Sequence, residues 1–135
     1  MWIVLTMAFV LVVYFTYLIF YPFKSIEFLQ PFKVLNENSE VKRGGELLLE
    51  VEYIKYTEAA SVVIRDIRCA DGNRVTLTPT KSDVDKGEGK TVTSINIPAK
   101  ISLGVCTYHS TIVHEINHFR VIETIVVSEP FEVIE

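Results

Sequence analysis

The most restrictive feature of the sequence is an N-terminal stretch without charge. No Lys, Arg, Asp or Glu precedes Lys24, and 20 of the first 23 residues are hydrophobic. In a helix that rises about 1.5 Å per residue, residues 2–21 are about 30 Å long, which matches the hydrocarbon core of a bilayer. In lipid, only a helix pairs all backbone polar groups of such a segment. The sequence therefore predicts a transmembrane anchor over residues 1–23.

Residues at both ends of this segment suit a membrane interface. Trp2 lies at one end and Tyr21 and Phe23 at the other, and Lys24 can extend its ammonium group to the lipid headgroups. Pro22 ends the helix. A cleaved signal peptide is the competing interpretation, but it would need a basic N-terminal region and a small-residue cleavage site. We therefore expect an uncleaved signal-anchor and a single-pass membrane protein.

Three tyrosines recur at helical spacing near the end of the anchor, at Tyr14, Tyr17 and Tyr21. They could form a helix-packing stripe for a membrane partner, whereas aromatic residues that merely tolerate lipid are the simpler interpretation. The segment lacks a Gly-x-x-x-Gly motif, so strong self-association through the helix is not indicated. It also contains no charged residue, so nothing indicates a channel or a proton relay.

Turn residues (Gly, Pro and Asp-Gly) divide the rest of the chain into short β-rich runs. In residues 46–56, Leu49, Val51, Tyr53 and Lys55 fall on one side of a predicted strand. The other strand-like runs are residues 60–70, 74–79, 90–98, 105–116, 120–127 and 130–134, together with 32–35 or Val41. No amphipathic helix of ten or more residues is visible. The pattern predicts an all-β antiparallel sandwich of seven or eight strands over residues 32–135, joined to the anchor by a short juxtamembrane linker, residues 24–31.

This layout resembles the immunoglobulin-like and fibronectin type III-like sandwiches. The residues that carry the resemblance are, in order, Gly44-Gly45 before a long strand, Arg68-Cys69 ending the third strand, Gly87 in the loop before residues 95–98, residues 104–108 opening the longest strand, and residues 128–133. The Trp that marks antibody domains is missing here, since Trp2 lies in the anchor. The resemblance is architectural and implies an immunoglobulin-like domain without a specific activity.

The same resemblance places the two cysteines. Cys69 would close the third strand and Cys106 would open the sixth, and these strands are antiparallel neighbours in such sandwiches. A disulfide between them is therefore a candidate, and two buried free thiols are the alternative. A bridge would imply an oxidising compartment and an extracytoplasmic C-terminal domain. Lys24 and Lys33, which follow the anchor, slightly favour the opposite orientation.

The sequence contains little that indicates catalytic or metal chemistry. His109 and His114 differ by five positions along one strand and should face opposite sides of the sheet, while His118 falls in a turn. Asp83 and Asp85 lie in a loop that superficially resembles a calcium site, but lysines interrupt it. We expect a solvated loop, no metal and no cofactor.

The remaining signals also argue against an enzyme. No nucleophile elbow and no glycine-rich phosphate loop is present. Asp66 lies between Arg65 and Arg68 and suits an ion pair on a sheet face better than general acid catalysis. The 13 basic and 17 acidic residues give a net charge of −4, which disfavours nucleic acid as a partner.

We therefore expect a non-enzymatic, membrane-anchored binding or scaffolding module whose partner, besides the lipid bilayer, is another protein. Exposed edge strands and the loops between strands are the expected binding surfaces. The candidate loop residues are Asp71, Gly72, Asn73, Asp83, Asp85, Asn117, His118 and Phe119. The alternative is a structural subunit of a larger membrane, envelope or phage-encoded assembly.

Overall fold

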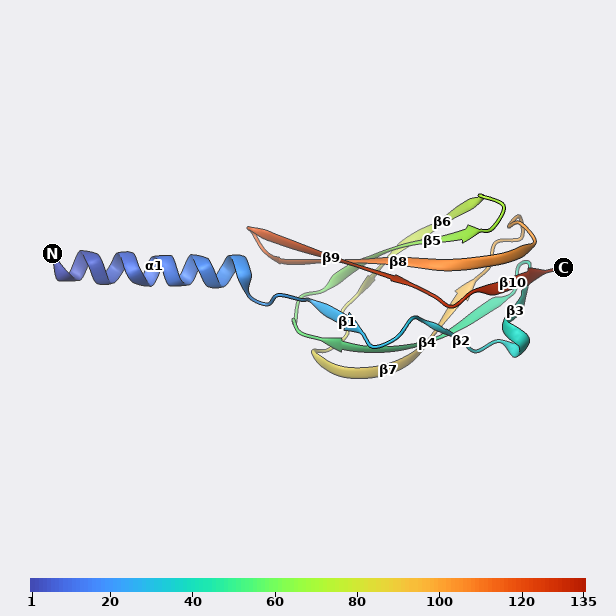
Figure 1. Ribbon diagram of the computed structural model, residues 1–135, viewed down its shortest axis with the longest axis horizontal. Coiled ribbons are helices and arrows are strands. Elements are labelled where there is room, and N and C mark those ends of the chain that lie inside the picture. Colours follow the sequence, from blue (N-terminus) through green and yellow to red (C-terminus); the bar gives the residue numbers. More distant parts are fainter.

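A computed structural model describes residues 1–135 and divides the chain into one helix and one β-sandwich (Figure 1). Helix α1, Trp2–Phe20, has 19 residues, and none of its residues is buried in the sandwich. By length and composition it is apolar enough to cross a membrane. The hydroxyl groups of Thr6 and Thr16 donate hydrogen bonds to the carbonyl oxygens four residues earlier, so even these polar groups are paired within the helix. At Tyr21 the backbone becomes extended, and Pro22 follows.

Ten strands follow the helix. Their bounds are β1 Ile26–Phe28, β2 Lys33–Val34, β3 Glu40–Lys42, β4 Glu46–Lys55, β5 Ser61–Cys69, β6 Arg74–Ser82, β7 Gly87–Asn96, β8 Gly104–Asn117, β9 Arg120–Val127 and β10 Phe131–Ile134. A short 3-10 helix, Glu37–Ser39, precedes β3. The six long strands from β4 to β9 correspond to the β-rich runs of the sequence.

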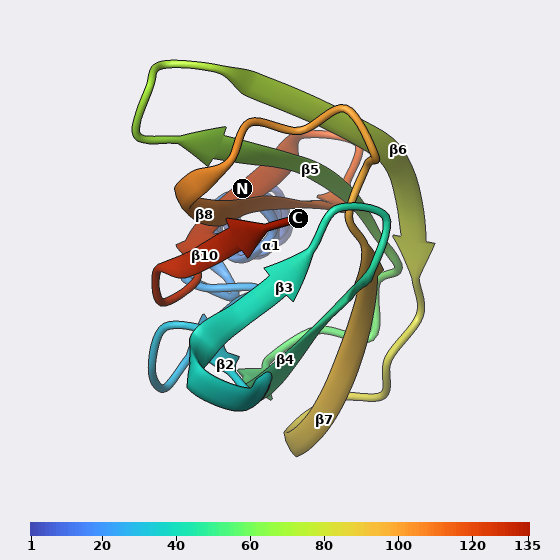
Figure 2. The same cartoon turned by 90° about the vertical axis from the view of Figure 1, so that its right-hand side faces the viewer.

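The strands form two sheets that face each other (Figure 2). In the first sheet, β1 and β2 pair with one edge of β4, and β7 pairs with the other edge. In the second sheet, β8 lies between β5 and the pair β9 and β10, β6 extends the sheet beyond β5, and β3 extends it beyond β10. The β-sandwich predicted from the sequence is therefore confirmed.

Several details differ from the expected seven or eight antiparallel strands. Strands β1, β2 and β3 have only two or three residues each, too few for an alternating pattern to be visible in the sequence. Strand β3 runs parallel to β10, a pairing of the two ends of the domain that local sequence does not encode. Strand β1 also lies within residues 24–31, which we expected as a linker. It pairs with β4, and its Ile26 and Phe28 pack against the core, so the sandwich begins there.

The interior of the sandwich changes along its length. The helix-distal end holds the β5–β6 turn and the C-terminus, and the helix-proximal end holds the β4–β5 connection and the β8–β9 turn (Figure 1). The fully buried apolar side chains include Leu47, Leu49, Ile67, Ile95, Ile97, Ile101, Phe131 and Val133. In the helix-proximal half, the buried residues include Lys55, Ser61 and His114. The fully buried apolar side chains thus gather toward the helix-distal end, whereas Lys55, Ser61 and His114 are buried toward the helix-proximal end.

The two cysteines form a disulfide at the helix-distal end. Cys69 and Cys106 are register partners at the end of β5 and the beginning of β8, with their Cα atoms 4.0 Å apart. The predicted adjacency is therefore confirmed, and the bridge joins neighbours within one sheet. Closing a loop of 37 residues contributes about 3–4 kcal/mol in a chain-entropy account.

The β8–β9 hairpin ties the sandwich to the helix. The side-chain amide of Asn117 donates a hydrogen bond of 2.8 Å to the carbonyl oxygen of Leu18. The ring of Phe119 meets that of Phe15 edge to face, with 6.1 Å between the ring centroids. Arg120 donates to the carbonyl oxygen of Phe23 at 3.2 Å. These contacts fix the hairpin tip against the last turns of α1.

Candidate functional site

The candidate loops of the sequence analysis lie at opposite ends of the sandwich. Residues 71–73 form the β5–β6 turn at the helix-distal end, whereas residues 83–86 and 117–119 lie at the helix-proximal end (Figure 1). The structure therefore does not bring these residues together into one site. Of the three, the 117–119 turn is engaged with the helix, and Phe119 remains largely exposed.

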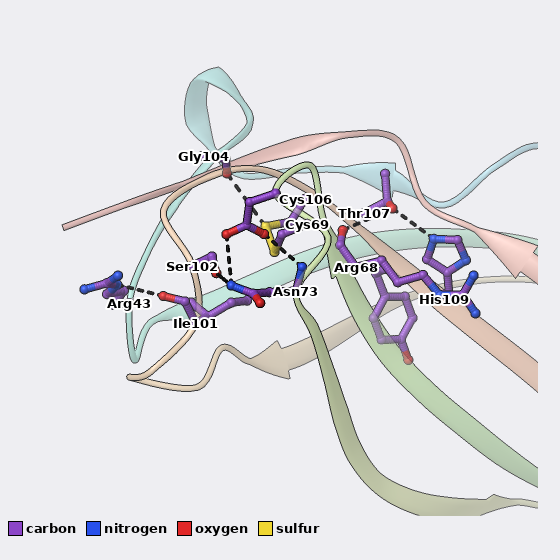
Figure 3. Close-up of a disulfide and its surroundings, with 12 residues drawn as sticks. Arg43, Arg68, Cys69, Asn73, Ile101, Ser102, Gly104, Cys106, Thr107 and His109 are labelled. Carbon is purple, nitrogen blue, oxygen red and sulfur yellow. Dashed lines mark hydrogen bonds between the residues drawn. A yellow bond between two sulfur atoms is a disulfide. The ribbon is translucent and has the colours of Figure 1, made fainter.

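The helix-distal turn is held by a small polar network beside the disulfide (Figure 3). The amide of Asn73 donates to Asp71 at 3.0 Å and to Ser102 at 2.6 Å. The backbone N–H of Asn73 donates to Asp71, and this bond, with a smaller effect from Ser102, lowers the pKa of the Asp71 carboxyl group. Gly72 has a φ of +89°, which a residue with a side chain rarely adopts. These hydrogen bonds stabilise the turn, and they assign a structural role to Asp71, Gly72 and Asn73.

The residues at the C-terminal end of α1 and just after it form an aromatic pair and a second, smaller polar network. Tyr21 stacks on Tyr17, with ring centroids 5.1 Å apart. Lys24 lies 3.6 Å from Glu27, and the hydroxyl group of Tyr56 donates to Glu27 at 2.8 Å. The Tyr56 hydrogen bond, and to a lesser extent the Lys24 charge, lower the pKa of Glu27. Trp2 lies at the far end of the helix, and Phe23 is exposed.

The outer face of the second sheet carries the ion pairs expected around Asp66. Its carboxylate accepts a hydrogen bond of 3.0 Å from Arg68 on the same strand and forms an ion pair with Arg74 on β6. Arg65 points to the interior instead. His109 is the register partner of Asp66, and its pKa is lowered by burial, by Arg68 and by Arg74, against an opposing effect of Asp66. This cluster stabilises the sheet face.

The histidines and acidic loop residues do not converge. His109 lies on the outer face and His114 on the inner face, as their odd spacing predicts, and His118 lies in the β8–β9 turn. No group of three His, Cys, Asp or Glu side chains in the chain could hold a metal ion.

A pocket of about 240 Å³ lies between the two sheets. Strand β4 contributes Leu49, Val51, Tyr53 and Lys55, and β5, β7 and β8 contribute side chains from the facing walls. Strands β6 and β7 are edge strands on the same side of the sandwich (Figure 2). Their lining residues Thr80, Thr91 and Thr93 are exposed, so the pocket opens between these two edges. Its volume lies just below the range of about 300–1,000 Å³ that is typical of small-molecule sites.

Two cations line this pocket. Lys55 is buried, with an exposed fraction of 3%. Its ammonium group donates a hydrogen bond to the carbonyl oxygen of Val84 at 2.5 Å. Arg65 donates to the carbonyl oxygen of Thr78 at 2.7 Å, while its Nε atom is buried without a partner. None of the 18 lining residues is acidic.

The ring of Tyr53, which lies over Gly89, shapes one wall of the pocket. Gly89 on β7 is the register partner of Tyr53 on β4. A Cβ atom on Gly89 would lie 2.3 Å from the Tyr53 hydroxyl oxygen, so the tyrosine ring lies across β7 only because residue 89 is glycine.

His114 is buried next to this pocket. It is the register partner of Ser61, a lining residue, and its exposed fraction is 0%. Neither ring nitrogen has a hydrogen-bond partner. Burial, followed by the positive charge of Lys55, lowers the pKa of His114. The imidazole is therefore neutral at pH 7.

Sequence reasoning placed the candidate site in loops and missed the pocket. The available signal was the inward position of Lys55 among apolar residues, which the alternation of β4 predicts correctly. A second signal is that Ser61, Ser110, Thr91 and Thr93 face inward on neighbouring strands, where a filled core would have larger side chains. These signals indicate a pocket only when the register between strands is known, because the register determines which side chains face each other.

We predict that His114 makes the stability of the sandwich depend on pH. The unfolded chain binds a proton at this histidine as the pH falls below about 6.5, whereas the folded chain binds it only at lower pH. The stabilising contribution of neutral His114 to the free energy of unfolding should therefore be fully present above that pH. It should fall by up to about 1.4 kcal/mol per pH unit as the pH drops toward the lowered pKa of the folded state.

Denaturant unfolding of the full chain in detergent micelles, followed by near-ultraviolet circular dichroism from pH 7.5 to 5, measures this slope. His114→Leu should remove the contribution of this residue and should not lower stability at pH 7, because two unpartnered buried nitrogens disappear. His118→Leu, in an exposed turn, is the matched control. An unchanged slope in His114→Leu would contradict the prediction.

No protein-family description and no curated protein matches the chain. Among solved structures, the C-terminal domain of Wzt is similar, with a TM-score of 0.52 and 11% sequence identity. The match covers 82% of this chain and 74% of that chain. At this identity the likeness concerns the fold alone, and it supports the assignment of a β-sandwich to this chain.

Proposed function

We propose that the protein is a non-enzymatic, single-pass membrane-anchored binding module that holds a small ligand between its two sheets. The observation that carries the proposal is the pocket that opens between β6 and β7. A sandwich of this size normally fills its interior with large apolar side chains. Here the lining includes Ser61, Ser110, Thr91 and Thr93, and the space is left open.

The rigidity of the surrounding structure supports this function. The walls come from long strands, and β4 and β7 are paired through ten register positions from Glu46 to Lys55. The helix-distal core and the disulfide stabilise the end of the sandwich away from the helix. A site built on paired strands keeps its shape better than a site built on loops.

We also propose that the sandwich is immunoglobulin-like. In support, β4 pairs with β7 in one sheet, and β5, β8 and β9 are neighbours in the other. This division corresponds to strands B and E facing strands C, F and G. The disulfide, however, joins neighbours within one sheet.

Filling the mouth of the pocket should abolish ligand retention. Thr93 lines the opening, whereas its neighbour Val92 points to the outer face and is 57% exposed. Native mass spectrometry of the full chain, extracted with its surrounding lipid, should detect a small molecule bound to the natural protein. Thr93→Phe should lose it, and the matched Val92→Phe variant should retain it. Equal retention in both variants, or no bound molecule in any, would argue against the pocket as the binding site.

The sandwich is proposed to be extracytoplasmic, because the Cys69–Cys106 disulfide persists in oxidising compartments. Labelling of intact cells with an impermeant thiol reagent tests this orientation. Labelling of both cysteines should require prior reduction and should occur without lysis. Ready labelling only after lysis, without reductant, would refute the proposed orientation.

A structural subunit of a larger membrane assembly is the second candidate, and the outer face of the second sheet favours it. Ile64 and Ile125 flank Thr111 in register, and they are 47% and 70% exposed. Apolar residues grouped on an outer face mark protein interfaces. Tyr14 and Tyr17 are also exposed on the helix.

A protein partner that packs along the helix should be lost when the tyrosine stripe is removed. Replacing Tyr14, Tyr17 and Tyr21 together by Leu keeps the helix apolar but removes the aromatic rings and hydroxyl groups. Co-purification in mild detergent should then lose the partner, whereas Leu substitutions at Phe9 and Phe20 should not affect it. An unchanged set of partners would count against the subunit hypothesis.

A further inference from the structure

We propose that the pocket between the sheets selects a compact apolar molecule that carries one negative charge, such as a carboxylate on an aliphatic or aromatic body. This inference rests on the proposed function and adds the chemical class of the ligand. It follows from an imbalance of charge. The pocket has two cations and no acidic residue in its lining, although the chain as a whole has a net charge of −4.

Lys55 is the first source of this imbalance. Its ammonium group has three N–H donors, and its one hydrogen bond goes to the neutral carbonyl group of Val84. None of the salt bridges of the chain involves Lys55, whose exposed fraction is 3%. A buried ammonium group without an anion is costly, since it has lost most of its hydration. An anionic ligand in the pocket would supply the missing partner.

Lys90 shows how this chain pairs a lysine that has only a structural role. It lies on the outer side of the sandwich, 3.1 Å from Glu50 and 3.4 Å from Glu52. The two carboxylates raise the pKa of Lys90, Glu50 having the larger effect. Lys55 belongs to the same sheet but faces inward and has no such partner. Lys90 is therefore neutralised by two carboxylates, whereas the only acceptor for Lys55 is a neutral carbonyl group.

Arg65 contributes a second unsatisfied donor to the same lining. Its Nη2 atom binds the carbonyl oxygen of Thr78, but its Nε atom is buried and unpartnered. Guanidinium groups favour carboxylates because the planar donors match the two oxygens. Two cationic donors from opposite sheets thus face a pocket that offers them only neutral acceptors.

The remaining walls define the uncharged part of the ligand. Ten of the 18 lining residues are hydrophobic, among them Ile26, Phe28, Val51, Val63 and Ile112. An apolar body would bury its surface against them at about 25 cal/mol per Å². The volume of about 240 Å³ limits this body to a short chain or a single ring. Inorganic anions lack the apolar part, and bulky lipids exceed the space.

The test compares three ligands that share one tail. Octanoate, octan-1-ol and octylamine carry negative, neutral and positive head groups, and calorimetric titration into the full chain in lipid nanodiscs measures their affinities. Empty nanodiscs of the same lipid correct for partitioning. Octanoate should bind at least about tenfold more tightly than octan-1-ol, because a charge-assisted hydrogen bond is worth more than a neutral one. Octylamine should not bind in the pocket.

Variants assign the selectivity to the two cations. Lys55→Met keeps the length of the side chain but removes its charge. It should lower the affinity for octanoate by about tenfold or more and leave the affinity for octan-1-ol unchanged. Arg65→Met should act in the same direction. Lys81→Met, at an exposed position on β6, is the matched control and should bind octanoate like the natural chain. The thermal midpoint of Lys55→Met should not fall, because a buried unpaired charge is removed.

The outcomes separate this inference from the proposed function. Equal binding of octanoate and octan-1-ol, both lost in Thr93→Phe, would overturn the charge selectivity and leave the pocket as a binding site. Failure of all three ligands to bind would overturn the ligand class, and the mass-spectrometric comparison of Thr93→Phe with Val92→Phe would then decide separately whether the pocket is used. Selective octanoate binding that survives Lys55→Met and Arg65→Met would also overturn the inference.

Discussion

The packing of the two sheets against each other is the constraint on which the rest of the structure depends, and it is uneven along the sandwich. At the helix-distal end, one hydrophobic cluster joins the two sheets, and its almost completely buried members include Leu47, Ile95, Ile97, Ile67 and Phe131. This end also carries the disulfide and the polar network of the β5–β6 turn. Such burial, at about 25 cal/mol per Å² of apolar surface, is the main favourable term in folding.

The helix-proximal half uses the same strands but with different inward residues. Along β4 the inward positions progress from Leu47 and Leu49 to Tyr53 and finally Lys55. Along β8 they progress from Cys106 to Ser110 and His114. Because paired strands hold both halves in one framework, the dense end can stabilise a less well-filled end. Proteins commonly place binding sites in such locally suboptimal regions, since the rest of the fold offsets the cost.

The sequence predicted correctly those elements whose formation depends on interactions within one segment of the chain. β-Rich runs bounded by turn residues identified the six long strands, and the alternation of β4 placed Lys55 correctly on the inner face. The charge-free segment predicted a helix, and α1 spans Trp2–Phe20. In both cases the relevant interactions lie within the segment itself, so no knowledge of distant residues was needed.

Features that depend on residues far apart in the chain could not be predicted. The parallel pairing of β3 with β10 joins residues about ninety positions apart, and the register shift between Val63 and Arg65 sets which side chains line the pocket. The pocket itself arises from small residues on several strands that become neighbours only after the sheets form. The sequence also does not show which loops share an end of the sandwich, and the candidate loop residues lie at two opposite ends.

The arrangement of charge within single strands explains how an acidic domain can present a cationic interior. Glu50 and Glu52 on β4 point outward, where water and Lys90 surround them, while Lys55 on the same strand points inward. Salt screens the outer charges over about 10 Å, whereas a buried charge is screened much less. The net negative field of the surface therefore weakens at physiological ionic strength, whereas the attraction between Lys55 and an anion inside the pocket weakens much less. Selection by this site would consequently act at short range, after entry between β6 and β7, rather than by long-range attraction to the domain.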